Sequence, residues 1–140
     1  MIAIDTSVLI DLIGEDARAA AAEDAVRGAL SQGPVVACEV VVSEVVAGLG
    51  HGSILVDMLE EAGIGFVPLE QRSAVRAGEM QRRYKERLRA GKDPLAQARA
   101  VPDFLVGAHA LLQCSALITR DASFFRAYFK GLKVIVPRAS

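Results

Sequence analysis

The side chains with the clearest chemical potential in this sequence are carboxylates that stand beside short apolar runs. Asp5 ends the first apolar run of the chain, and Asp121 comes shortly after a later one. Glu44 follows another such run, and Asp103 opens the segment that leads into the run before Asp121. Several carboxylates in one cleft repel each other, most strongly where the dielectric constant is low. A divalent cation would relieve that repulsion, and Mg²⁺ and Mn²⁺ take hard oxygen ligands.

Each of these acids also has a simpler structural interpretation. Asp5 and Asp121 belong to a residue type that caps helix N-termini well. Asp103 would be favoured at the positive end of a helix dipole, by about 0.3–1 kcal/mol, and Glu44 can lie on a solvated helix face. No cluster of histidines or cysteines in the sequence competes as a metal site. The fold that positions the acids therefore has to decide between the two interpretations.

Hydrophobic patterning predicts short buried strands separated by helices. The strands are expected at 2–4, 35–37, 64–69, 116–119 and 133–137. The helices are expected at 8–13, 17–30, 40–49, 53–63, 70–91, 102–114 and 121–129, with a loop at 92–101. Strands that alternate with helices form parallel βαβ units with right-handed crossovers, and helices then cover both faces of the sheet. We therefore predict an α/β fold: a three-layer α/β/α sandwich around a mostly parallel five-stranded sheet.

Two of the expected helices have unusual compositions. The segment 40–49 is rich in valine, which prefers strands, but a glycine stop at its end favours a helix. The segment 70–91 is strongly polar, and we expect it to bury one apolar stripe. That stripe consists of Ala74, Ala77, Tyr84 and Leu88.

Composition limits the class of protein. With 140 residues, 52% of them hydrophobic, the chain is expected to form one domain, 1–140, with a sizeable core. No apolar run is long enough to span a bilayer, and the first residues lack the pattern of a signal peptide. Cys38 and Cys114 lack metal-ligand spacing, and reduced core cysteines of this kind indicate a cytoplasmic protein. The formal net charge is −1, so an anionic partner would have to bind a local basic patch.

Four segments of the chain resemble the PIN domain family, and most closely the VapC-type toxins of bacterial toxin–antitoxin pairs. The segments are DTSVLIDL at 5–12, SEVVAGL at 43–49, PDFLVGAHALL at 102–112 and LITRDASFF at 117–125. Their order and spacing extend the resemblance over essentially the whole chain, although the stretch 48–101 carries no signature. The resemblance implies the strand order 3-2-1-4-5, which places the strands before Asp5 and Asp121 side by side.

The resemblance also implies a function, that of a metal-dependent endoribonuclease with Mg²⁺ as cofactor, for which Mn²⁺ can substitute. Its metal-binding and catalytic residues, carried over position by position, are Asp5, Glu44, Asp103 and Asp121. Glu39 is a rival for Glu44 because both follow the strand at 35–37, but the residues around Glu44 match the family segment. Thr6 and Thr119 match polar positions near the metal and rank below the acids.

An RNA substrate would need cations near this negative site. The candidates for RNA binding are Arg82, Arg83, Lys85, Arg87 and Arg120, although a basic run on a polar helix is also typical of a solvated face. In such an enzyme a metal-activated water attacks the phosphodiester bond. The resemblance implies a small antitoxin protein as a second partner, and we expect a homodimer, the commonest soluble assembly, with no membrane association.

Other reactions on phosphorus fit the sequence less well. A phosphatase with an aspartyl nucleophile usually has a second aspartate two residues after the first, where this chain has Ser7. A phospho-receiver domain needs a lone aspartate after the third strand, which here ends in FVPL. An acidic-site phosphatase of similar fold and a catalytically silent PIN-like binding module remain the alternatives, and the intact set of acids argues against the silent module.

Overall fold

Strand β1 (Ile2–Ile4) lies at the centre of a five-stranded sheet whose order is β3-β2-β1-β4-β5. The structure is a computed structural model that describes residues 1–91 and 101–138. All four strand pairs are parallel, including the pairs of β1 with its neighbours β2 and β4. The other strands are β2 (Val35–Ala37), β3 (Ile64–Phe66), β4 (Ala116–Ile118) and β5 (Lys133–Ile135). The predicted strand order is therefore confirmed.

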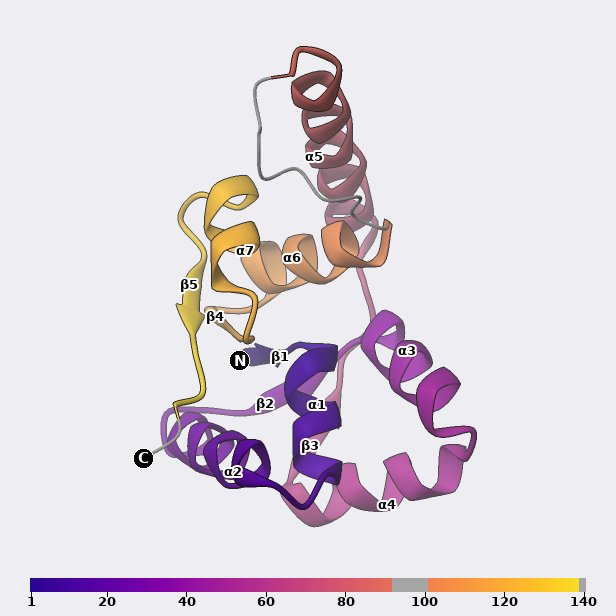
Figure 1. Cartoon of the computed structure of the whole chain (residues 1–140), viewed down its shortest axis with the longest axis vertical. Coiled ribbons are helices and arrows are strands. Elements are labelled where there is room, and N and C mark those ends of the chain that lie inside the picture. The colour runs from indigo at the N-terminus through magenta and orange to yellow at the C-terminus, as the bar shows by residue number, and fades with distance from the viewer. Residues whose placement is uncertain (92–100, 139–140) are drawn as a thin grey trace.

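The described residues form helices on both faces of this sheet. They are α1 (Thr6–Ile13), α2 (Ala17–Leu30), α3 (Glu39–Leu49), α4 (Gly52–Ala62), α5 (Gln71–Arg89), α6 (Val101–Gln113) and α7 (Ala122–Tyr128). The chain runs from β1 to β3 in one direction and then returns to β4 and β5. Right-handed crossovers therefore place α1 to α4 on one face and α5 to α7 on the other, as Figure 1 shows. The predicted loop at 92–101 lies largely outside the described residues.

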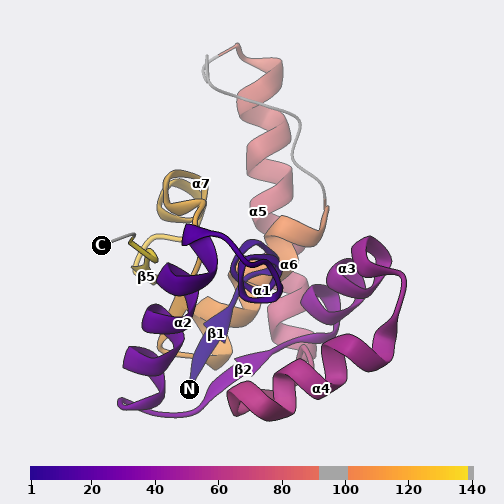
Figure 2. The ribbon, with the colours of Figure 1, turned by 60° about the horizontal axis from the view of Figure 1, so that its bottom comes forward.

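Local sequence explains where the helices begin and end. Gly50 and Gly63 follow α3 and α4 in the left-handed conformation, with φ of 78° and 74°, which glycine adopts without a steric penalty. The valine-rich α3 is a helix, as predicted, and it buries Val41 and Val45 against the core. Figure 2, which looks from the α2 and α4 side, shows α1 end-on between α2 and α3.

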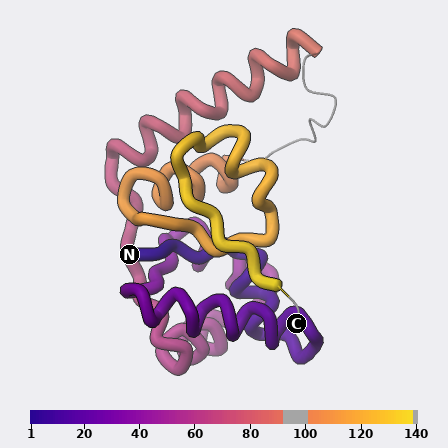
Figure 3. The backbone as a smooth tube through the Cα atoms, turned by 90° about the vertical axis from the view of Figure 1, so that its left-hand side faces the viewer, coloured from indigo at the N-terminus to yellow at the C-terminus, as the bar shows by residue number. Residues whose placement is uncertain are grey.

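The predicted apolar stripe of α5 is partly wrong. Ala77 and Tyr84 are buried, but Ala74 and Leu88 are exposed, and Ser73 is buried in their place together with Met80. The Ser73 hydroxyl donates a 2.7 Å hydrogen bond to Gln113 Oε1 on α6, so its burial leaves no unsatisfied group. The sequence pattern left Ser73 out of the apolar stripe because serine is a polar residue. Figures 1 and 3 both show the last turns of α5 projecting beyond α6 and α7.

One histidine and the two cysteines lie in surroundings that explain them structurally. His109 is buried on α6, and its Nε2 lies 2.9 Å from the carbonyl oxygen of Val67. Burial lowers the pKa of His109, so the ring is neutral and its Nε2–H donates to that carbonyl. Cys38 is buried and Cys114 partly buried, and both are free thiols whose pKa burial raises. None of the described helices is long and apolar enough to span a membrane.

Gly107 marks the closest approach between α6 and the end of α7. A Cβ at this position would overlap the ring of Phe129, which is itself fully buried, whereas nothing lies within 4 Å of a Cβ at Gly28 on α2. We predict that Gly107→Ala destabilises the protein by about 1–3 kcal/mol through overpacking. Gly28→Ala, the matched control, should stabilise it by about 0.5–1 kcal/mol. Urea denaturation measures both; equal stability of the two variants would contradict this packing.

Candidate active site

Asp5 lies at the carboxyl end of β1, immediately before the first residue of α1. Its side chain is buried, with 8% of its surface exposed. Oδ1 accepts a hydrogen bond from the backbone N–H of Thr6 at 2.8 Å. Oδ2 accepts two more, from the hydroxyls of Thr119 at 2.6 Å and Ser7 at 3.2 Å. Asp5 can therefore be both a helix cap and a site residue, because one of its carboxylate oxygens caps α1 and the other faces β4.

Thr119 connects the ends of the two central strands. Its Oγ1 donates to Asp5 and accepts a 3.0 Å hydrogen bond from the backbone N–H of Asp121. The side chain of Thr119 is completely buried. Because Ile4 pairs with Ile118 in the parallel register, the residues that follow them emerge at the same edge of the sheet. The hydroxyl of Thr119 therefore fixes the spacing between Asp5 and the start of α7.

The structure places the two rival glutamates in different surroundings. Glu44, exposed on α3, accepts a 2.9 Å hydrogen bond from the hydroxyl of Thr6, the residue next to Asp5. Glu39 instead accepts a 2.8 Å hydrogen bond from the backbone N–H of Leu69, in the segment that follows β3. Glu44 therefore lies beside Asp5, and Glu39 ties α3 to the β3–α5 connection. This geometry supports the choice of Glu44.

Asp103 and Asp121 begin the two helices that flank β4. Asp103 lies in the first turn of α6 and Asp121 precedes α7, and both are partly buried. The side chain of Asp121 makes no capping hydrogen bond to α7, every residue of which the structure describes. The capping interpretation thus fails for Asp121, although the aspartate occupies the N-cap position.

Burial is the main cause of the raised pKa of Asp5. The hydrogen bonds from Thr119, Thr6 and Ser7 lower this pKa, and the negative charge of Glu44 raises it further. A buried carboxylate beside a second anion is an environment that a bound cation would stabilise. The carboxylate and hydroxyl oxygens around Asp5 are also the hard donors that Mg²⁺ prefers.

The acids do not form a closed cage, however. Within residues 1–91 and 101–138, no three His, Cys, Asp or Glu side chains converge closely enough to hold a metal ion. The structure links Asp5 to Glu44 through Thr6, and to the backbone of Asp121 through Thr119. Mg²⁺ commonly keeps several waters and binds through only one or two carboxylates. The donor set therefore fits such an ion with water completing its coordination.

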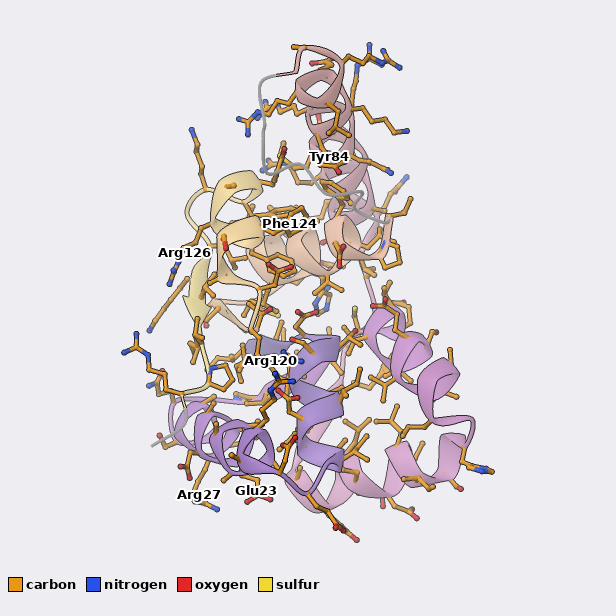
Figure 4. The ribbon with its side chains drawn as sticks, viewed as in Figure 1. Glu23, Arg27, Tyr84, Arg120, Phe124 and Arg126 are labelled. Carbon is orange, nitrogen blue, oxygen red and sulfur yellow. The ribbon has the colours of Figure 1, made fainter. Side chains whose placement is uncertain are left out.

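Sequence reasoning missed an ion pair beside this site, between a buried acid and an exposed arginine. Asp11 lies on α1 with 7% of its surface exposed. Its Oδ2 lies 2.7 Å from Nε of Arg120, the residue between Thr119 and Asp121. Figure 4 shows Arg120 lying against α1. Ser7, one turn before Asp11 on α1, donates a hydrogen bond to Asp5, so the same helix contacts both Arg120 and Asp5. An acid inside the apolar run VLIDLI was the available signal, because a carboxylate there needs a partner.

The other RNA-binding candidates lie on α5. Arg82 pairs with Glu86 at 3.3 Å, and the guanidinium carbon of Arg87 lies 5.1 Å from the centre of the Tyr128 ring. Arg83 and Lys85 are exposed. Arg120, by contrast, pairs with Asp11. Among these candidates, the cations without a carboxylate partner in the described residues are Arg83, Lys85 and Arg87, all on α5.

Comparison with known proteins agrees with this fold. The model of the PIN domain family matches residues 2–130. A search of curated proteins finds no matching sequence. Since the family model covers most of the chain, the protein belongs to the PIN domain family.

Solved toxin–antitoxin structures share the fold. VapBC-1 from nontypeable Haemophilus influenzae superposes with a TM-score of 0.70 at 17% identity, covering 97% of this chain and 98% of the other. A toxin–antitoxin complex from Klebsiella pneumoniae gives 0.65 at 23% identity, covering 100% of both chains. The sarcin–ricin loop cleaving toxin VapC20 of Mycobacterium tuberculosis gives 0.64 at 19% identity, covering 95% and 99%. At these identities the likeness establishes the fold.

Thr119→Val tests the central contact of the site. Valine keeps the shape of threonine but neither donates to Asp5 nor accepts from the Asp121 N–H. We predict that the pKa of Asp5 rises further, because a hydrogen bond that lowers it is removed. NMR titration of the metal-free protein measures this pKa. Thr6→Val is the matched control, since its hydroxyl contacts Glu44 and its backbone N–H remains; the same pKa in both variants would contradict the assigned role.

Proposed function

We propose that this PIN domain is a Mg²⁺-dependent endoribonuclease, active also with Mn²⁺, and the toxin of a bacterial toxin–antitoxin pair. The observation that carries the proposal is the buried Asp5 carboxylate, which is linked to Glu44 through the backbone N–H and hydroxyl of Thr6, and to the start of α7 through the hydroxyl of Thr119. A helix cap alone does not need a second carboxylate beside it, because two neighbouring anions repel each other. The proposed metal-binding and catalytic residues are Asp5, Glu44, Asp103 and Asp121.

A bound divalent ion would supply an activated water and neutralise charge that develops on the scissile phosphate. Asp5, fixed by three hydrogen-bond donors, holds its oxygens in one orientation before any substrate arrives. Glu44, exposed and less constrained, is suited to accept a proton from the attacking water. Thr6 and Thr119 act as positioning residues, because their hydroxyls contact the acids.

The toxin assignment draws on what the similar structures contain. The Haemophilus and Klebsiella proteins are toxin–antitoxin complexes, and the Mycobacterium protein cleaves the sarcin–ricin loop. By analogy we propose RNA as substrate and a small antitoxin as inhibitor. A basic side chain of the antitoxin can pair with the acids in place of the metal. We also propose one PIN-like domain over 1–140, a homodimer and a cytoplasmic location.

Substitution of single acids tests the catalytic proposal. Asp5→Asn and Glu44→Gln should each reduce metal-dependent cleavage of RNA by about a hundredfold or more, because each removes a charge that holds the metal. Asp16→Asn is the control for Asp5, since Asp16 caps α2 through the N–H of Arg18 and asparagine caps as well. Glu39→Gln is the control for Glu44.

Cleavage is followed on a labelled RNA with Mn²⁺ or Mg²⁺ and with a chelator. Both controls should retain activity, and the chelator should abolish it. A fully active Glu44→Gln together with an inactive Glu39→Gln would show that the wrong glutamate was chosen. Metal-independent cleavage that survives Asp5→Asn would overturn the proposal.

A further inference from the structure

A polar cavity that none of the proposed acids line lies where α5, α6 and the end of α7 meet. It has a volume of about 170 Å³, and four basic residues line it: Arg76, Arg83, Arg87 and Lys130. No acidic residue stands among the described residues that line it. These four cations come from two separate parts of the chain, so the fold gathers them around one space. Arg76 and Lys130 were not among the RNA-binding candidates of the sequence.

The cations around this cavity are largely uncommitted. Arg76 makes a 3.6 Å ion pair with Glu79. Within the described part of the chain, Arg83, Arg87 and Lys130 have no carboxylate partner. Arg87 instead lies over the ring of Tyr128, 5.1 Å from its centre. A cavity with this charge and without internal acids favours an anion.

Tyr128 provides independent support for a ligand. It lines the cavity, only 8% of its surface is exposed, and its hydroxyl has no hydrogen-bond partner among the described residues. A buried hydroxyl without a partner costs free energy, and phenylalanine would fill the same place without that cost. The neighbouring rings of Tyr84 and Phe124 pack edge-on or tilted against Tyr128, so packing needs only the ring.

We propose that this cavity binds a phosphate group of the RNA backbone, at a distance from the acids that cut. The inference rests on the proposed function, because it gives the ribonuclease a second contact with its substrate. The guanidinium groups of Arg83 and Arg87 bind the phosphate oxygens, and the phenol of Tyr128 donates a further hydrogen bond. Because this hydroxyl is buried in the free protein, neighbouring side chains move as the phosphate enters.

Such a site would fix the register of the RNA. A phosphate contact positions the strand without reading its bases. The distance between this cavity and Asp5 then selects the phosphodiester bond that reaches the acids. The protein therefore has two separate sites for the RNA, one that binds a phosphate group and one that cuts the chain.

Binding of a short single-stranded RNA oligonucleotide in chelator, where metal-dependent cleavage is absent, tests the proposal. Fluorescence anisotropy measures the affinity at several salt concentrations. Tyr128→Phe should weaken binding by roughly ten- to a hundredfold, as expected when one hydrogen bond to a charged group is removed. The Arg83→Gln, Arg87→Gln double variant should weaken it by at least about tenfold and reduce the salt slope by about 0.7 for each phosphate that is no longer neutralised.

The control is the Arg18→Gln, Arg27→Gln double variant, which removes the same charge from α2 on the other face of the sheet and should bind as the wild type does. Thermal unfolding of Tyr128→Phe should occur at or above the wild-type temperature, which separates a binding defect from a folding defect. Wild-type RNA affinity in both cavity variants would overturn the proposal. The proposal would also be overturned if the cavity variants bound RNA as the wild type does but no longer bound free inorganic phosphate or an acidic peptide. Because cleavage is not measured, an inactive enzyme would leave this test intact.

Discussion

The structure of the site depends on a single buried carboxylate. Burial of Asp5 raises its pKa, and the hydroxyls of Thr119 and Ser7 with the Thr6 N–H lower it again. Those donors come from two different strand ends, so the carboxylate is well placed only while β1 and β4 are neighbours. The central position of β1, flanked by helices on both faces, thus explains why the proposed site includes the first residues of the chain. The ion pair of Asp11 with Arg120 holds α1 against the same β4–α7 turn.

A cap and a catalytic residue need not exclude each other. Asp5 binds the first N–H of α1 with one oxygen and Thr119 with the other, so the helix terminus helps to orient the acid. Asp121 occupies the N-cap position of α7 without a capping hydrogen bond from its side chain, whereas Asp16 caps α2 in the ordinary way. The geometry of the hydrogen bonds, more than the position in the helix, separates the proposed site residues from purely structural ones.

Sequence patterns predicted the strands and the helices, because buried parallel strands and glycine stops have strong local signals. They failed where a polar residue is buried with a partner from elsewhere. Ser73 depends on Gln113, and Asp11 depends on Arg120, and neither partner is near in sequence. The unpartnered hydroxyl of Tyr128 is likewise visible only in three dimensions. Local patterns fix elements, whereas the satisfaction of buried polar groups is a property of the assembled fold.

Thermal unfolding with and without Mn²⁺ tests the central claim, that Asp5 is the core of a metal site. Metal that binds only the folded state raises its unfolding temperature, so wild type and Asp16→Asn should both shift upwards at millimolar Mn²⁺. Asp5→Asn should not shift. Without metal it should unfold at or above the wild-type temperature, because the raised pKa means that ionised Asp5 opposes folding at neutral pH. An equal Mn²⁺ shift in Asp5→Asn, or none in the wild type, would contradict the account.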